Sequence, residues 1–324
     1  MTAQDDVGEV SEVEATVTPQ ARAHLLAAYD LALLANAPNY DLREPDERAR
    51  SVRDLERLFF RAVRLLQPEV FIEAGAKDAT ASRRARRYLP DARIVAFEAN
   101  PYVHDRFRER NEEPKHRMEY RHLALSDTVG EVTFNVMRGA DGRPLANGKG
   151  SLKDLVQHEY GTQQVTVPST TLDRFFAEHR GSPTVMWVDV EGATEQVLGG
   201  GKELLADVQL IFIEVEDRDR WVWGPAWTMN DVSAFLLGHG LIPVGRDYQS
   251  RFQYNVLFAR PEVLLDHRFR PALTLHRSGA YRTEPPPPPP PPPPPETTLR
   301  RLRRVAGRVK RRLRAATRRA PATR

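Results

Sequence analysis

Apolar residues recur along the chain in two different periods. Near the start, helical spacing predicts two helices, over residues 19–36 and 44–66. From residue 69 onward, short runs rich in β-branched residues alternate with helical segments. Strands are expected at 69–75, 93–100, 120–127, 130–137, 164–170, 183–190, 208–216, 241–247 and 253–260.

This alternation predicts an α/β fold in which a mostly parallel sheet carries helices on both faces. The last two strands are joined by a short polar turn, so one of them is expected to be antiparallel at the sheet edge. The two early helices precede the first clear strand, so they are expected to cap the domain. Residues 138–162, rich in Gly and Lys, are expected to form a long loop.

Five segments follow from these patterns. Residues 1–18 are expected to be a disordered acidic N-terminus, 19–66 a helical cap, and 67–262 the main domain. Residues 263–295 are interpreted as an irregular segment that ends in a polyproline linker, and 296–324 as a basic amphipathic tail. The eleven consecutive prolines predict a stiff polyproline II spacer of about 30–35 Å, at ~3.1 Å per residue.

Charge is distributed very unevenly. The net charge of +4 combines +11 on residues 296–324 with −7 on residues 1–295. The main domain is therefore not expected to bind nucleic acid. The chain has no cysteine, which excludes disulfides, thiolate metal sites and a cysteine nucleophile. Neither a signal peptide nor a membrane-spanning run is seen, which favours a cytoplasmic protein.

Polar residues gather where the predicted strands end. In an open α/β sheet, ligands bind beyond the carboxyl ends of the strands, so these residues are candidates for a site. Nearly all of them are acids, which suits a ligand that carries hydroxyl groups and positive charge. They are Glu73, Glu98, Ser126, Asp127, Asp189, Glu191, Glu214 and Glu216.

Glu98 and Gly75 suggest what the ligand is. An acid at the end of the second strand, soon after a glycine turn, is placed to accept hydrogen bonds from ribose hydroxyls. Gly75 would let the backbone approach the ligand closely. A dinucleotide would require further glycines for its pyrophosphate, which this loop lacks. S-adenosylmethionine fits better, with Glu73 or Asp189 meeting its ammonium group.

Several segments together resemble the FkbM-type methyltransferases over roughly residues 66–260. The most specific are "FEANP" at Phe97–Pro101 and "DVEGATEQVLGG" at Asp189–Gly200. The resemblance implies a Rossmann-like seven-stranded fold and S-adenosylmethionine-dependent methylation of hydroxyls on sugars or natural products. It implies that the cofactor is bound by Glu73, Gly75, Ala76, Glu98, Ala99, Asn100, Ser126, Asp127 and Asp189, with Ser126 and Asp127 near the adenine.

The loop departs from the family pattern Asp-x-Gly-Ala-Asn-x-Gly at three positions, where this chain has Glu73, Lys77 and Ala79. Glu73 keeps the charge of the aspartate. Lys77 either repels the cationic cofactor or points to solvent. Ala79 is expected to be tolerated if it is helical, because only a positive φ would require glycine.

The resemblance places Asp189 and Glu191 beside the reaction centre. Methyl transfer to an alcohol requires a base, and Asp189 is the first candidate, followed by Glu191 and Glu214. A divalent metal held by these acids is left open, since hard cations prefer oxygen ligands, but the pattern alone does not show one. Trp221, Trp223 and Trp227 could stack on a sugar ring or simply fill the core.

Two classes of function are compatible with the sequence. The first is an O-methyltransferase acting on a small-molecule or glycan acceptor. The second is a weakened methyltransferase-fold binding module that acts through its basic tail. The apolar stripe of residues 296–324 favours an anionic membrane surface over nucleic acid as the partner of that tail, which would place the protein at the inner membrane face. Oligomeric state is not indicated.

Overall fold

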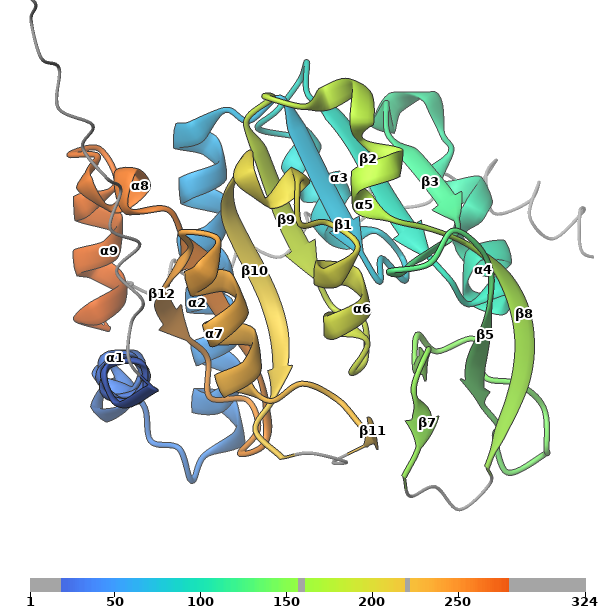
Figure 1. Cartoon of the computed structure of the whole chain (residues 1–324), viewed down its shortest axis with the longest axis horizontal. Coiled ribbons are helices and arrows are strands. Elements are labelled where there is room, and N and C mark those ends of the chain that lie inside the picture. The colour runs from blue at the N-terminus through green and yellow to red at the C-terminus, as the bar shows by residue number, and fades with distance from the viewer. Residues whose placement is uncertain (1–18, 157–160, 219–221, 280–324) are drawn as a thin grey trace, which may run out of the picture. The chain divides into compact units, whose positions relative to one another are not determined.

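The computed structural model describes residues 19–156, 161–218 and 222–279 (Figure 1). The acidic N-terminus 1–18, the polyproline run and the basic tail 296–324 lie outside these residues. The described residues form one compact unit. Within them, no helix is both long and apolar enough to cross a bilayer.

The predicted sheet is confirmed. It has seven strands, and β1, β2, β3, β9 and β10 run parallel to one another. The antiparallel strand is β13, which lies one position in from the edge strand β12. In spatial order the strands are β12 (Ile242–Arg246), β13 (Gln253–Ala259), β10 (Val208–Glu216), β9 (Thr184–Val188), β1 (Val70–Ala74), β2 (Arg93–Glu98) and β3 (Glu119–His122).

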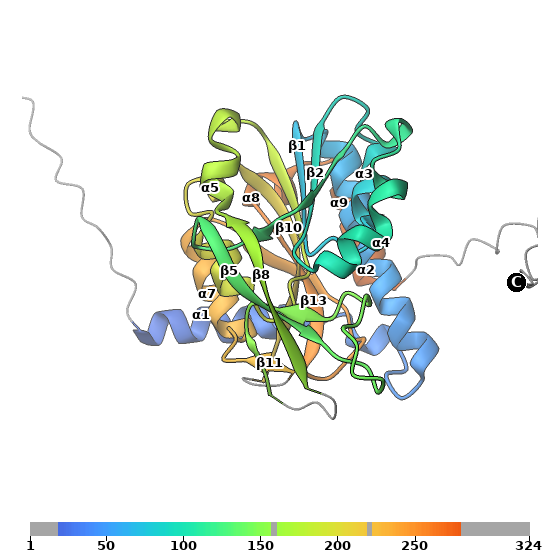
Figure 2. The same cartoon turned by 90° about the vertical axis from the view of Figure 1, so that its right-hand side faces the viewer.

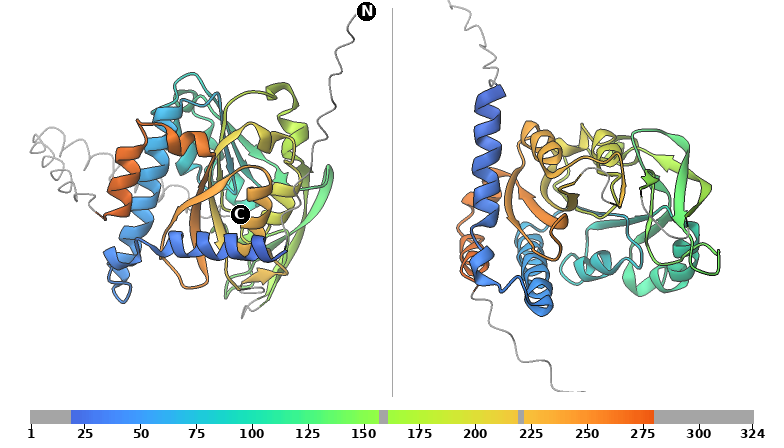
Figure 3. Two further views of the ribbon diagram at one scale, coloured as in Figure 1. Left: turned by 60° about the vertical axis from the view of Figure 1, so that its left-hand side comes forward. Right: turned by 90° about the horizontal axis from the view of Figure 1, so that it is seen from below.

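Helices cover both faces of this sheet, as the view from below shows (Figure 3). Strand side chains alternate between the faces, so Ile72 packs in one core cluster and Phe71 in the other. One face is covered by α2 (Pro45–Leu66), α3 (Thr80–Arg86), α4 (Pro101–Asn111), α8 (Pro261–Leu265) and α9 (Arg270–Arg277). The other is covered by α1 (Pro19–Leu34), α5 (Leu172–Phe175), α6 (Thr194–Gly199) and α7 (Met229–Gly238).

A smaller sheet stands beside the main one (Figure 2). It contains β4 (Ala124–Leu125), β8 (Thr162–Thr170), β5 (Gly130–Met137) and β6 (Gly150–Ser151). The expected long loop 138–162 thus contains β6 and also β7 (Asp154–Leu155), which pairs with β11 (Trp223–Gly224). The short 3₁₀ turns are η1 (Ala37–Asn39), η2 (Pro114–His116), η3 (Ala177–His179) and η4 (Leu204–Ala206).

The expectation of irregular chain immediately after residue 262 was wrong. Helices α8 and α9 occupy most of residues 261–277 and pack on α2. Phe269 is 1% exposed and Ala272 is also buried, so this segment contributes to the core of the domain. Both helices have proline in their first turn, where the missing N–H costs no helical hydrogen bond.

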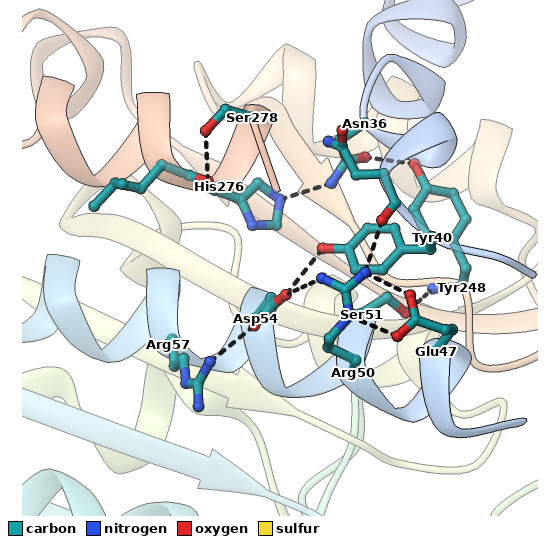
Figure 4. A network of polar contacts seen from close by, with 12 residues as sticks. Asn36, Tyr40, Glu47, Arg50, Ser51, Asp54, Arg57, Tyr248, His276 and Ser278 are labelled. Carbon is teal, nitrogen blue, oxygen red and sulfur yellow. Dashed lines mark hydrogen bonds and ion pairs between the residues drawn. The ribbon is translucent and has the colours of Figure 1, made fainter. Parts of the chain in front are cut away.

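A buried polar network joins α9 and the N-terminal helices to the sheet (Figure 4). Asp54 of α2 is fully buried and accepts hydrogen bonds from Tyr40 Oη at 3.2 Å and Arg57 Nη1 at 3.0 Å. His276 of α9 contacts Asn36 Nδ2 at 3.2 Å. Asn36 also accepts from Tyr248 Oη at 2.5 Å, in the turn between β12 and β13. One group of buried side chains therefore holds together elements that are far apart in the sequence.

We predict that Asp54→Ala destabilises the domain, because Tyr40 and the arginines of α2 would lose a buried anionic partner. The free energy of unfolding should fall by about 3–5 kcal/mol. Chemical denaturation measures this change. Asp46→Ala, at an exposed position in the same helix, is the control and should cost no more than about 1 kcal/mol. Equal losses in the two variants would contradict the role of the network.

Candidate cofactor and active site

The acids at the strand ends share one row across the sheet. Glu98 pairs with His122, and Glu214 pairs with Asn255. Between them, the registers of β1, β2, β9 and β10 place Gly75 and Asp189 in the same row. Side chains in one row point to the same face, here the face of α2, α3 and α4. The row thus runs Glu98, Gly75, Asp189, Glu214, with a glycine between the acids.

Gly75 is required by this arrangement. A Cβ atom at this position would lie 1.7 Å from the carbonyl oxygen of Asp189, and its φ is +77°. The close approach follows from strand pairing, since the N–H of Asp189 donates to the carbonyl of Ala74 at 2.9 Å. Any side chain at residue 75 would have to separate β1 from β9.

The loop after β1 adopts left-handed conformation at alternate residues. Lys77 has φ 47° and Ala79 has φ 55°. The condition under which Ala79 would be tolerated is therefore not met, because it lies in the left-handed region immediately before α3. Such conformations cost non-glycine residues about 1–2 kcal/mol each. The glycine and asparagine of the family pattern are the residue types that adopt this backbone most easily.

Glu73 stabilises the N-terminal turn of α3. Its carboxylate accepts from the N–H groups of Ser82 at 2.7 Å and Ala81 at 3.3 Å, in the first turn of that helix. Burial raises the pKa of Glu73 to about 7. The side chain thus has a structural role, although it also borders a second cavity beside Gly75, Ala76, Lys77 and Asp189.

Glu98 is held by the backbone on both sides. Its two oxygens accept from the N–H groups of Lys77 and Asn100, each at 2.7 Å. Burial raises its pKa to about 7. Each oxygen has a further lone pair, so the carboxylate can accept additional hydrogen bonds. Asn100 itself caps α4 by accepting from the N–H of Tyr102 at 3.0 Å.

A cavity opens beside this carboxylate. It brings together five of the predicted residues: Gly75, Glu98, Ala99, Asp189 and Glu191. Its remaining walls are mainly apolar and were not predicted as site residues. They include Phe97, Leu123, Leu125, Phe134, Gly148, Gly150 and Leu152.

Ser126 and Asp127 are not brought to the wall of this cavity. Their backbone packs against α6, where a Cβ on Gly200 would lie 2.1 Å from the carbonyl oxygen of Ser126. The Ser126 hydroxyl donates to Asp127 Oδ1 at 3.1 Å. The cavity wall here is formed instead by Leu123, Ala124 and Leu125.

Two carboxyl groups, Asp189 and Glu214, are neighbours at the other end of the row, and a third, Glu191, interacts with them electrostatically. Glu214 accepts from Gln253 Nε2 at 2.9 Å and shares a hydrogen bond with Asp189. Burial and the charges of Asp189 and Glu191 raise the pKa of Glu214 well above its usual value. The raised pKa of Glu214 favours its neutral form, which can donate to the Asp189 carboxylate. Burial likewise raises the pKa of Asp189, and that of Glu191 to about 7.

The described acids are not grouped as metal ligands. Across residues 19–156, 161–218 and 222–279, no three His, Asp or Glu side chains are grouped so that they could hold a metal ion. The acids instead interact with one another through a shared proton, which lowers the cost of burying them together.

Two segments that are far apart in the sequence pair with each other near these acids. β7 from the insertion pairs with β11 from the loop after β10. Trp223 in β11 is fully buried, and Trp227 packs against the core, while Trp221 lies outside the described residues. The two described tryptophans therefore act as packing residues.

The segment 145–153 crosses the cavity and is attached at several points. The carbonyl of Leu145 accepts from Asn100 Nδ2 at 3.4 Å, and that of Ala146 from Arg106 Nη1 at 2.9 Å. Lys153 pairs with Glu195 of α6 at 3.3 Å. Its glycines allow this close path, because a Cβ on Gly150 would lie 2.6 Å from Phe134.

The fold and the site together define an α/β protein with a candidate ligand site at the carboxyl edge of its sheet, where open α/β folds bind their ligands. The family model "Methyltransferase FkbM domain" matches residues 73–243, more than half of the chain. The chain therefore belongs to the FkbM methyltransferase family.

A curated relative and two solved structures are similar to this chain. The 2-O-methyltransferase NoeI of Sinorhizobium fredii is 30% identical over 157 residues, which span 46% of this chain and 64% of NoeI. Precorrin-6y C5,15-methyltransferase from Geobacter metallireducens is 13% identical, with 66% and 87% of the chains covered and a TM-score of 0.34. N-methyltransferase NodS from Bradyrhizobium japonicum is 13% identical, with 67% and 98% covered and a TM-score of 0.35. Structural likeness at these scores has no bearing on function.

Glu73 should make stability depend on pH. Its folded pKa of about 7 lies above the usual 4.5, so the fold favours the neutral acid. The contribution of Glu73 to the free energy of unfolding is therefore largest below pH 4.5 and is lost as the pH rises to 7. Relative to Glu73→Gln, the wild type should lose at most about 3 kcal/mol of unfolding free energy between pH 5 and pH 7. Denaturant titrations at both values test this. Glu109→Gln, at an exposed position, should show no such difference.

Gly75→Ala should be far more damaging than Gly142→Ala. Both glycines have similar positive φ, +77° and +73°, but a Cβ at Gly142 meets no atom within 4 Å. Gly142→Ala should cost only the backbone term of about 1–2 kcal/mol. Gly75→Ala should cost at least about 2 kcal/mol more, because β1 and β9 must separate. Thermal unfolding of both variants gives the comparison, and similar melting temperatures would refute the close-packing argument.

Proposed function

We propose that this chain is an S-adenosylmethionine-dependent methyltransferase that methylates a hydroxyl group of a sugar, a glycan or glycolipid, or a natural product. The observation that carries the proposal is the cavity in which Glu98, Gly75 and Asp189 lie side by side. Family membership supports the reaction type. The printed activity of the relative NoeI, a 2-O-methyltransferase, supports a hydroxyl acceptor.

The residues of the cavity fit an adenosyl group. Phe97, Leu123 and Leu125 offer apolar surface for a flat purine. The Glu98 carboxylate is fixed by two N–H groups yet has lone pairs left for ribose hydroxyls. At Gly75 the missing side chain leaves the backbone open to the ligand. S-adenosylmethionine, when bound there, supplies the activated methyl group.

Asp189 is placed to act as the general base. During attack of an acceptor hydroxyl on the methyl carbon, the oxygen–carbon bond forms as the carbon–sulfur bond breaks, and the hydroxyl proton must be taken up. Burial raises the pKa of Asp189, which strengthens it as a base. Glu214 holds that carboxylate in position through the shared hydrogen bond. Glu191, on the same cavity wall, can bind a neighbouring hydroxyl of the acceptor.

The basic tail, residues 296–324, could bring the protein to a membrane that contains its acceptor. A glycolipid acceptor would make contact between residues 296–324 and an anionic membrane useful, since enzyme and acceptor would then share one surface. Binding of the full chain to anionic liposomes at low salt, compared with a chain ending at residue 295, tests this part separately.

Asp189→Asn should lower turnover by about 10²- to 10⁴-fold, the usual contribution of a general base. Binding of the cofactor should change much less, because Glu98 and the apolar walls are unaltered. Transfer of labelled methyl to a panel of sugars measures turnover, and calorimetry measures binding. Glu203→Gln, a remote surface change, should leave both unaltered. If the wild-type protein binds no S-adenosylmethionine at millimolar concentration, the proposed function is refuted.

A further inference from the structure

Two cavities meet at Gly75 and Asp189. The first contains Glu98 and the apolar walls, and the second is bordered by Lys77, Ala76, Glu73 and Trp187. If the proposed function holds, the nucleoside occupies the first cavity. The sulfonium, which joins the nucleoside to the methionine, must then lie close to the two shared residues.

Lys77 is held at this junction. Its N–H donates to Glu98 Oε2, and its carbonyl accepts from the Tyr120 hydroxyl. The stem of its side chain lies against Gly148, where a Cβ would be only 2.7 Å from Lys77 Cδ. The ammonium group is therefore anchored through its stem at the rim of the cavities.

The charge of Lys77 acts on the site without being neutralised there. Burial raises the pKa of Glu98 and of Asp189, and the charge of Lys77 opposes that rise at both. Lys77 itself borders the second cavity, and its stem lies against Gly148 on the wall of the first. Among the described residues, no carboxylate lies within 4.0 Å of that ammonium. The backbone does not favour a lysine here either, because its φ of 47° is one that glycine or asparagine adopts more easily.

We propose that Lys77 determines how strongly the protein prefers S-adenosylhomocysteine, the neutral product, over S-adenosylmethionine, the cationic substrate. An ammonium group at the junction repels the sulfonium but not the thioether. The carboxylate and ammonium of the methionine part are present in both ligands, so their interactions with Lys77 cancel in the ratio of the two affinities. This inference rests on the proposed function. The ratio of the two affinities reports only the repulsion between Lys77 and the sulfonium.

The test is calorimetric titration of the full chain with each ligand in turn. Lys77→Met keeps the stem against Gly148 and removes the charge. It should shift the ratio of dissociation constants about three- to tenfold toward S-adenosylmethionine at low salt, and the shift should shrink as salt screens the charge. Lys77→Arg keeps the charge and should leave the ratio at the wild-type value.

Two outcomes would overturn the inference. If both ligands lose affinity by the same factor in Lys77→Met, Lys77 holds the carboxylate that they share. If neither affinity changes, the ammonium is simply solvated. Each result leaves the proposed function intact, because the wild type still binds both ligands. Failure of the wild type to bind either ligand would instead refute the proposed function, and this inference with it.

Discussion

The structure of the site depends on the close contact between Gly75 and the carbonyl oxygen of Asp189. β1 and β9 are central neighbours in the sheet, and their pairing continues to the residues that end them. With no side chain at Gly75, Glu98 and Asp189 can flank a common opening although each belongs to a different strand. The cavity, the loop of left-handed residues and the position of Lys77 all follow from this contact.

Burying so many acids at one sheet edge creates an electrostatic problem that the protein solves in two ways. Glu73 and Glu98 receive backbone N–H groups, which fix their orientation and favour the charged form. Asp189 and Glu214 have fewer such donors and share a proton instead. The first arrangement makes rigid acceptors, suited to binding. The second makes a pair whose proton can move, which suits acid–base chemistry.

Much of the fold could be predicted because it depends on local periodicity. Alternating strand and helix patterns identified the parallel sheet, and polar residues at strand ends identified Glu98, Asp189 and Glu191 as neighbours. Other features depend on tertiary contacts that a single sequence does not reveal. The left-handed φ of Ala79 occurs in the loop between β1 and α3. Ser126 and Asp127 pack against Gly200, the residue after α6, instead of lining the cavity. Helices α8 and α9 are short, and only packing on α2 distinguishes them from irregular chain.

The acceptor side of the site is assembled from segments that the family fold does not by itself specify. β7 and β11 come from two loops more than fifty residues apart, and β11 lies beside the turn after Glu191, where a Cβ on Gly192 would be 3.2 Å from Trp223 Cβ. The segment 145–153 adds the glycines that approach Phe134 and Lys77. The strand-end residues Glu98, Gly75, Asp189 and Glu214 thus belong to the main sheet, while the walls beside them lie on connected loops. Under the proposed function, acceptor specificity can change through these loops without disturbing the row Glu98, Gly75, Asp189 and Glu214, whose geometry the sheet register determines.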